Sequence, residues 1–171
     1  MVYRLYPMDT TIRSATEGDV ALILELIHGL AEYERLAHEV TATEATLRTS
    51  LFGATPGAEV VIAESGGEPV GFALFFHNFS TFVGKRGIYL EDLFVKPAWR
   101  GKGVGRRLLV HLAQLAVERD CGRLEWAVLD WNEPAISFYR GLGAQPMHDW
   151  TVFRLAGDTL YQLAAERAET R

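Results

Sequence analysis

Two parts of the sequence carry side chains that could exchange protons with a reacting group. Glu91 and Asp92 are adjacent carboxylates in an otherwise apolar run, GIYLEDLFV over residues 87–95. A carboxylate beside an amine can accept the proton that the amine must lose before it attacks a carbonyl carbon. Tyr139, in the run WNEPAISFYR over residues 131–140, could return a proton to a leaving group. The alternatives are an exposed acid on the far side of a sheet for Glu91 and a packed ring for Tyr139, and for Tyr139 taken alone the packed ring is favoured.

A third chemical feature is the glycine-rich turn RGKGVG over residues 100–105. Glycine lets the backbone approach an anion closely, and the first N–H groups of a helix that begins here favour phosphate. The positive side chains around the turn are Arg100, Lys102, Arg106 and Arg107. The P-loop pattern is not met, and the dinucleotide fingerprint fails because Arg106 stands where its third glycine is required. The pattern R-x-x-G-x-G/A is met by Arg100, Gly103 and Gly105, and a glycine turn without a ligand remains the alternative.

Hydrophobic periodicity predicts the elements that hold these residues. Strands are expected from about residue 11 and over 59–64, 70–79, 87–95, 123–129 and 151–155. Helices are expected over 16–33, 43–52, 104–119 and 132–141, and from about residue 158. Hairpins followed by one late β-α-β crossover predict an α/β (α+β) fold with a central mixed, mostly antiparallel sheet flanked by helices. We assign residues 1–10 to an N-terminal extension and residues 11–171 to one domain.

Composition excludes several classes of function. The formal net charge is -5, whereas a nucleic-acid-binding protein usually has a basic excess. No stretch approaches the roughly 20 apolar residues of a membrane span, and the N-terminus lacks the apolar segment of a signal peptide. The five histidines show no shared ligand spacing, and the one cysteine, Cys121, is expected to fill space in the core. These features predict a cytoplasmic protein without a metal, a membrane or a nucleic-acid partner.

The glycine turn resembles the signature loop of the GNAT superfamily of N-acetyltransferases. Two further segments, IYLEDLFV over residues 88–95 and WNEPAISFY over residues 131–139, resemble the diamine acetyltransferases, which comprise the spermidine/spermine enzymes and their thialysine-acetylating relatives. The resemblance also includes LAEYE over residues 30–34 and LGA over residues 142–144, and it runs from about residue 12 to about residue 165. These motifs are specific together and weak singly.

The resemblance implies a reaction and its partners. Acetyl-CoA would donate an acetyl group to a primary amine of a small molecule, by direct attack in a ternary complex and without a metal. The acceptor would be a diamine, a polyamine or a thialysine-like or lysine-like amino acid, and the enzyme would be a homodimer. Two alternatives stay open: acetylation of a protein lysine or N-terminus, and a catalytically silent acyl-CoA-binding sensor or scaffold.

The resemblance also implies roles for individual residues. Tyr139 would protonate the leaving thiolate, and Glu91 would accept the proton of the amine, directly or through water. The residues implied in coenzyme binding are Leu93, Phe94, Val95, Arg100, Gly101, Lys102, Gly103, Val104, Gly105, Arg106, Asn132 and Tyr139. Those implied in acceptor binding are Tyr33, Glu34, Glu91, Asp92 and Trp150. Because side chains alternate along a strand, Glu91 and Asp92 are expected to point to opposite faces, with Glu91 toward the reaction.

The sequence departs from the spermidine/spermine pattern at two positions. Those enzymes carry Asp-Pro-Trp before the Glu-Asp strand and acids beside the late tryptophan. Here the chain reads Ser80-Thr81-Phe82 and His148-Asp149-Trp150, so the aspartate of the first segment is absent. A long polycation needs several acids to hold its spaced ammonium groups. The segments over residues 80–82, 127–132 and 142–145 look more like the thialysine branch, which favours a small amine or a diamino acid.

Overall fold

The computed structural model describes residues 10–166, in two compact units that divide between Ala127 and Val128. The first unit contains a five-stranded sheet and three α-helices. Its strands are β1 (Thr10–Ser14), β2 (Glu59–Ser65), β3 (Glu68–Ser80), β4 (Lys85–Val95) and β5 (Leu124–Trp126). Its helices are α1 (Val20–Glu34), α2 (Glu44–Phe52) and α3 (Val104–Glu118). Residues 1–9 of the expected extension lie outside the described residues, and Thr10 already belongs to β1.

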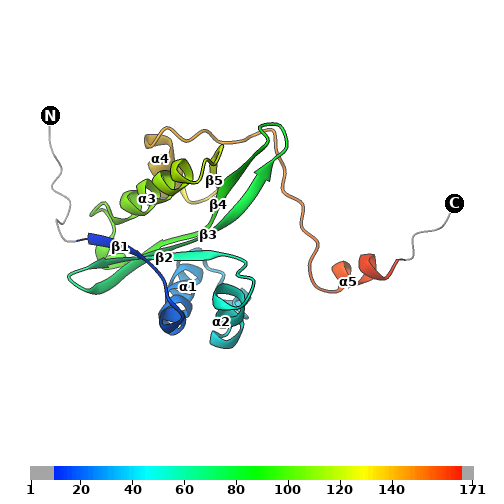
Figure 1. Cartoon of the computed structure of the whole chain (residues 1–171), viewed down its shortest axis with the longest axis horizontal. Helices are drawn as coiled ribbons and strands as arrows, with labels where there is room; N and C mark the ends of the chain where they lie inside the picture. The colour runs from blue at the N-terminus through cyan, green and yellow to red at the C-terminus, as the bar shows by residue number, and fades with distance from the viewer. Residues whose placement is uncertain (1–9, 167–171) are drawn as a thin grey trace. The chain divides into compact units, whose positions relative to one another are not determined.

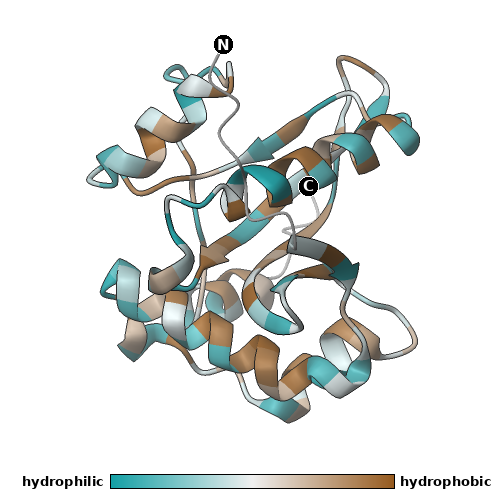
Figure 2. Ribbon diagram, turned by 90° about the vertical axis from the view of Figure 1, so that its left-hand side faces the viewer, coloured by the Kyte–Doolittle hydropathy of each residue, from teal (hydrophilic) through white to brown (hydrophobic). Residues whose placement is uncertain are grey.

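The sheet has the order β1-β2-β3-β4-β5. The first three pairings are antiparallel, and β4 pairs with β5 in parallel, which confirms the predicted mixed, mostly antiparallel sheet. Helices α1 and α2 cover one face, and α3 covers the other (Figure 1). The helices carry alternating apolar and polar bands, as expected of helices packed on a sheet (Figure 2). None of the helices within residues 10–166 is long and apolar enough to cross a bilayer.

Helix α1 packs closely on β4 because it carries a glycine where the two meet. A Cβ atom added to Gly29 would lie 2.9 Å from the ring of Phe94, too near for a side chain. Phe94 belongs to a buried cluster that joins α1 and α2 to β2, β3 and β4. The members of this cluster are Ile23, Leu26, Leu51, Val60, Ile62, Phe72 and Phe94. The core therefore fixes the distance between α1 and the strand that carries Glu91 and Asp92.

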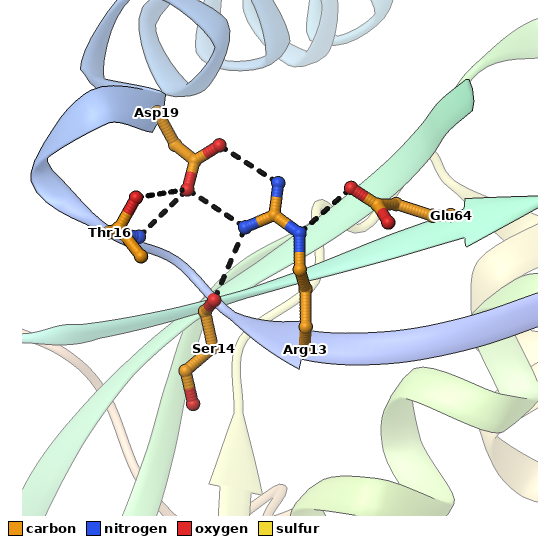
Figure 3. A network of polar contacts seen from close by, with 5 residues as sticks. All are labelled: Arg13, Ser14, Thr16, Asp19 and Glu64. Atoms are coloured by element: carbon orange, nitrogen blue, oxygen red, sulfur yellow. Dashed lines mark hydrogen bonds and ion pairs between the residues drawn. The ribbon is translucent and has the colours of Figure 1, made fainter. Parts of the chain in front are cut away.

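A polar network fixes the start of α1 (Figure 3). Arg13 on β1 donates two 2.8 Å hydrogen bonds to the carboxylate of Asp19, and its Nε donates a third to Glu64 on β2. The same carboxylate accepts the backbone N–H of Thr16 at 2.7 Å. The hydrogen bonds from Arg13 hold the pKa of Asp19 well below its usual range. The ion pairs thus join the first two strands to the turn that precedes α1.

Strand β5 is shorter than predicted. The sequence predicted a strand over residues 123–129, whereas the structure pairs only Leu124, Glu125 and Trp126 with β4, and residues 127–129 are irregular. The last pair joins Leu90 to Trp126, and the next residue of β4 interrupts the regular strand. An apolar run predicts burial, but pairing ends where the partner strand changes its register.

The second unit contains α4 (Glu133–Gly141) and α5 (Asp158–Ala165). Asn132 caps α4 as predicted, because its side-chain oxygen accepts the backbone N–H of Ala135 at 3.3 Å. The predicted strand over residues 151–155 is wrong: this segment is irregular and exposed. In the part of this unit that the structure describes there is no strand, so the segment has no ladder within its own unit to join.

Candidate active site

A β-bulge in β4 lies between the two adjacent acids. Asp92 stands opposite Leu74 of β3, and Leu90 stands opposite Phe75, the next residue of β3. Glu91 is therefore the extra residue of the bulged strand. A bulge bends the strand and redirects the side chains on either side of it.

The strand pairing shows which face of the sheet Asp92 and Tyr89 occupy. Residues that stand opposite each other in a sheet point to the same face, and residues two apart on one strand do so as well. Asp92 thus points to the same face as Leu74, which packs against the buried cluster that contains Phe94. Tyr89 points to that face as well, together with Phe76, which stands opposite it on β3. Glu91 acts electrostatically on both Asp92 and Tyr89. Strict alternation does not extend across a bulge, so the expectation that Glu91 and Asp92 point to opposite faces stays a prediction.

A third acid joins this pair from α1. Glu34 is the last residue of the helix, and burial raises the pKa of its carboxyl group. Burial, together with the nearby charges of Glu91 and Glu34, raises the pKa of Asp92 to about 6. The two partly buried carboxylates, Asp92 and Glu34, and the exposed Glu91 hold excess negative charge, which a bound cation would stabilise. A protonated amine is such a cation.

Two more residues border the acids and were not predicted. Burial raises the pKa of Tyr89, as do the charges of Glu91 and Glu125, and its ring lies 5.2 Å from that of Phe76. Glu125 on β5 accepts hydrogen bonds from Asn78 and from Arg123, each at 2.8 Å. Tyr89 could have been found from its position two residues before Glu91. Nothing in the sequence indicated Glu125, since only the pairing of β4 with β5 places it beside Tyr89.

The glycine turn lies between β4 and α3 and has the backbone that close contact with an anion requires. Gly101 and Gly103 adopt left-handed conformations, with φ of 73° and 86°. Helix α3 begins at Val104, so its first N–H groups have no acceptor within the helix and are available to phosphate oxygens. At Gly105 an added Cβ would make an ordinary 3.7 Å contact with Val95, which explains why the pattern accepts alanine there. This backbone fits a pyrophosphate.

Two basic side chains of the turn, those of Lys102 and Arg100, lie over aromatic rings. The Lys102 ammonium lies 4.7 Å from the centre of the Trp99 ring, within cation–π range. The Arg100 guanidinium lies 4.4 Å from the ring centre of Tyr33 and 5.6 Å from that of Phe94. The Arg106 side chain is exposed. The structure therefore brings Arg100 to the end of α1.

The end of β4 has one edge without a strand partner in the sheet. Leu93, Phe94 and Val95 pair with β3 on one side. On the other side the pairing with β5 ends at Leu90, and no described strand pairs with residues 91–95 there. An extended ligand chain could add to this edge in the way that a strand does.

The remaining predicted residues belong to the second unit. Asn132 is buried at the N-terminus of α4. Tyr139 lies in the last turn of the same helix, half-buried, with its ring 5.4 Å from that of Phe138. Trp150 is exposed and lies outside any helix or strand. Glu91 and Tyr139, the two candidate catalytic residues, thus come from different units.

Metal ligation finds no support in the described part of the chain. Among residues 10–166, no group of three or more histidine, cysteine, aspartate or glutamate side chains is arranged to hold a metal ion.

Comparison with known proteins identifies relatives over most of the chain. Residues 24–144 match the acetyltransferase (GNAT) family. Thialysine N-epsilon-acetyltransferase of Bos taurus is 42% identical over 166 residues, which cover 91% of this chain and 97% of the relative. L-ornithine N5-acetyltransferase of Arabidopsis thaliana is 35% identical, and the match covers 90% of this chain and 87% of the relative. These matches confirm the predicted superfamily and its thialysine branch.

A solved structure shows the same fold. An integron cassette protein from the mobile metagenome of V. cholerae superimposes with a TM-score of 0.78 at 29% identity. The match covers 93% of this chain and 99% of the other. The likeness confirms the predicted α/β fold with a mixed sheet.

Proposed function

Because the chain belongs to the GNAT family of acetyltransferases, we propose that it transfers an acetyl group from acetyl-CoA to a primary amine of a small molecule. The observation that carries this proposal is the half-buried Asp92 beside the bulge at Glu91, where the charges of Glu91 and Glu34 both act on its carboxyl group. The strand that carries the bulge leads into the glycine turn. An amine-binding cluster and a phosphate-binding turn therefore lie at one end of the same sheet.

At the acceptor end, the acids attract the amine and then remove its proton. Asp92 and Glu34 are the more buried acids, so they hold the ammonium group by charge. Glu91 is the more exposed and accepts the proton, directly or through water. Tyr33 and Trp150 supply apolar contact to the carbon chain of the acceptor.

At the donor end, the turn and the free edge of β4 hold the coenzyme. Acetyl-CoA is the co-substrate of the GNAT family and supplies an acyl group activated as a thioester. The N–H groups of the turn and of the first residues of α3 hold the pyrophosphate. The positive charges near it are those of Arg100, Lys102 and Arg106. The backbone of Leu93, Phe94 and Val95 aligns the pantetheine arm.

The second unit completes the reaction in this proposal. Tyr139 donates a proton to the departing thiolate, and Asn132 contacts the coenzyme while it caps α4. The amine attacks the thioester directly in a ternary complex, so no residue needs to become acetylated. The ammonium group loses one proton to Glu91 before it attacks and a second proton when the amide forms. Tyr139 gives its proton to the sulfur and regains one from the second, so the reaction releases one proton overall.

The acceptor that fits best is a small diamino acid. The relatives named above act, by their names, on thialysine and on L-ornithine. Thialysine and ornithine each carry a side-chain amine at the end of a short chain. Around residues 80–82 the chain lacks an acid: Ser80 is buried and Phe82 is 95% exposed. The missing acid favours an amino acid over a polyamine as the acceptor, because the spaced positive charges of a polyamine need more carboxylates to bind them.

We also propose a cytoplasmic homodimer. Large apolar side chains are exposed along the second unit, and a second copy could cover them. These residues are Trp150, Val152, Phe153, Leu155, Leu160, Tyr161 and Leu163. Exposed apolar surface of this extent marks interaction sites in soluble proteins.

Thiol release tests the proposed activity. The full chain is incubated with acetyl-CoA and a panel of amines: thialysine, L-ornithine, L-lysine, spermidine, a lysine-containing peptide and a buffer blank. Thialysine or ornithine should release thiol well above the blank and above spermidine. Greater release with the peptide would favour a protein acceptor. Coenzyme binding without thiol release from any amine would favour an acyl-CoA sensor and overturn the proposal.

A further inference from the structure

We propose that Arg123 and Glu125 form a second acceptor subsite, which binds the α-carboxylate and the α-ammonium group of a diamino acid while its side-chain amine lies at Asp92. This inference rests on the proposed function, because it takes the acids beside the bulge as the place of the reacting amine. The pair selects among amines by the end of the acceptor that does not react.

Asp92 and Glu125 lie on the same face of the sheet. Tyr89 stands opposite Glu125 of β5, so their side chains point to one face. That face is also the face of Asp92, as the pairing of β4 with β3 shows. Strands lie about 4.8 Å apart and rise about 3.3 Å per residue, so the backbones at Asp92 and Glu125 are separated by roughly 10 Å. Both acids are half-buried, and a short acceptor chain can reach from one to the other along this face.

Two neighbours fix the carboxylate of Glu125. Nδ2 of Asn78 donates a 2.8 Å hydrogen bond to Oε2, and Nε of Arg123 forms an ion pair with the same oxygen at 2.8 Å. The Asn78 amide is oriented toward Glu125, although its buried Oδ1 atom then has no hydrogen-bond partner in the described part of the chain. Both contacts involve Oε2, which leaves the second oxygen, Oε1, for an N–H group of a ligand.

A glycine on β4 makes room for these side chains. Gly87 stands opposite Asn78, and a Cβ atom added to it would lie 2.5 Å from Oδ1 of Asn78 and 2.9 Å from Cγ of Arg123. Both distances are too short for a real side chain. Asn78 and Arg123 therefore meet over the bare backbone of β4, the same strand that carries Asp92.

An ion pair of this kind matches the head group of an α-amino acid. The α-ammonium group donates hydrogen bonds, which the carboxylate of Glu125 accepts. The contact of Arg123 with Glu125 is made by Nε, so its terminal N–H groups are directed to the α-carboxylate. In a diamine no carboxylate offsets the charge of Arg123, which then repels the second ammonium group. The pair therefore favours diamino acids over diamines.

Acceptors that lack one group each provide the test. Putrescine is ornithine without the α-carboxylate, and 5-aminopentanoate is ornithine without the α-ammonium group. In the wild type, kcat/KM for L-ornithine should exceed that for each analogue about three- to tenfold, since the pair is partly exposed. Arg123→Gln should reduce the preference over putrescine to less than twofold, and Glu125→Gln should do the same for 5-aminopentanoate.

Arg119→Gln is the matched control. Arg119 follows α3 and forms an ion pair with Glu59 on the other face of the sheet, so its replacement should leave both preferences unchanged. An Arg123→Gln variant that slows L-ornithine and putrescine equally would overturn the inference, because Arg123 would then only support the fold. So would a wild type that uses putrescine as well as L-ornithine.

A second measurement does not depend on turnover. L-ornithine is titrated by calorimetry into the full chain saturated with CoA. Its Kd should be about three- to tenfold higher in Arg123→Gln and Glu125→Gln than in the wild type and in Arg119→Gln. Equal Kd values, or no binding of L-ornithine to the wild type, would overturn the inference. If the Kd values follow the expected order but no amine releases thiol, the proposed function fails and the subsite stands.

Discussion

Asp92 stands opposite Leu74 in the sheet, whereas its neighbour Glu91 has no partner on β3 and forms a bulge. Asp92 points to the face that α1 covers, and the charges of Glu91 and Glu34 act on its carboxyl group. Asp92 therefore lies in an acidic site, and its ionised form destabilises the protein in the absence of a cation.

The first prediction concerns the pH dependence of stability. The pKa of Asp92 is raised in the folded protein from 3.8 to about 6, so the folded state binds this proton more tightly than the unfolded chain. The free energy of unfolding should then fall as the pH rises from about 4 to 6, by roughly 3 kcal/mol from this group. Asp92→Asn cannot ionise and should be more stable than the wild type at pH 8, by about 1–3 kcal/mol.

Urea unfolding at pH 4, 6 and 8 measures this difference. Most of the stability gained in Asp92→Asn should disappear at pH 4, where the wild-type carboxyl is protonated in the folded state and partly protonated in the unfolded state. Asp149→Asn is the matched control, because Asp149 is exposed and its replacement should leave stability unchanged at every pH. An Asp92→Asn variant that is less stable than the wild type at pH 8 would contradict the prediction.

The second prediction concerns catalysis by Glu91. Glu91→Gln removes the proposed base, so kcat should fall at least tenfold. It also removes a negative charge that raises the pKa of Asp92, so that pKa should drop. In the wild type, kcat/KM should decline as the pH falls through about 6, because protonated Asp92 attracts the amine less. In Glu91→Gln that decline should occur at lower pH, and an unchanged profile would argue against the pairing of these acids.

Local pattern predicted most of the fold. Helices over 20–34, 44–52 and 104–118 and the hairpin of β2 and β3 have clear periodicity and caps, such as Thr43 before α2. The errors arose where the structure of a segment depends on a neighbouring strand. Residues 151–155 have the composition of a strand but no neighbouring strand in their unit, and β5 ends early because its partner bulges.

The resemblance supplied the candidate acids Glu91, Asp92 and Glu34, but the sequence did not predict the bulge at Glu91. A bulge depends on how two strands align, which no single segment specifies. Tyr89 and Glu125 were missed for the same reason, since their proximity follows from the pairing of β4 with β5.

The third prediction tests the glycines of the turn. Gly103 has a φ of 86°, which costs about 1–2 kcal/mol in a residue with a Cβ. Gly103→Ala should therefore weaken CoA binding about five- to thirtyfold. Gly105→Ala should weaken it much less, because its added Cβ makes only an ordinary contact. Calorimetric titration of CoA compares the two, and equal losses would show that the left-handed backbone is not required.

The fourth prediction concerns the network of Figure 3, in which Asp19 binds Arg13. The pKa of Asp19 is lowered in the folded protein, so its contribution to stability is present above about pH 4 and is lost as the pH falls further. Asp19→Asn should lower the free energy of unfolding at pH 7 by roughly 1–3 kcal/mol, with allowance for the partial exposure of Arg13. Urea unfolding should show this deficit shrinking below pH 4, whereas a deficit that is independent of pH would contradict an ionic role.

The fifth prediction tests Tyr139. Tyr139→Phe removes only the phenolic oxygen, so α4 and the ring contact with Phe138 should persist. If the hydroxyl protonates the thiolate, kcat should fall well over tenfold, while the Kd of CoA changes less than twofold, because the lost interaction exists mainly in the transition state. Phe138→Leu is a useful comparison, since it alters packing beside Tyr139 and keeps the hydroxyl. Full turnover in Tyr139→Phe would assign the proton to another donor, and a loss in CoA binding equal to the loss in kcat would make Tyr139 a binding residue.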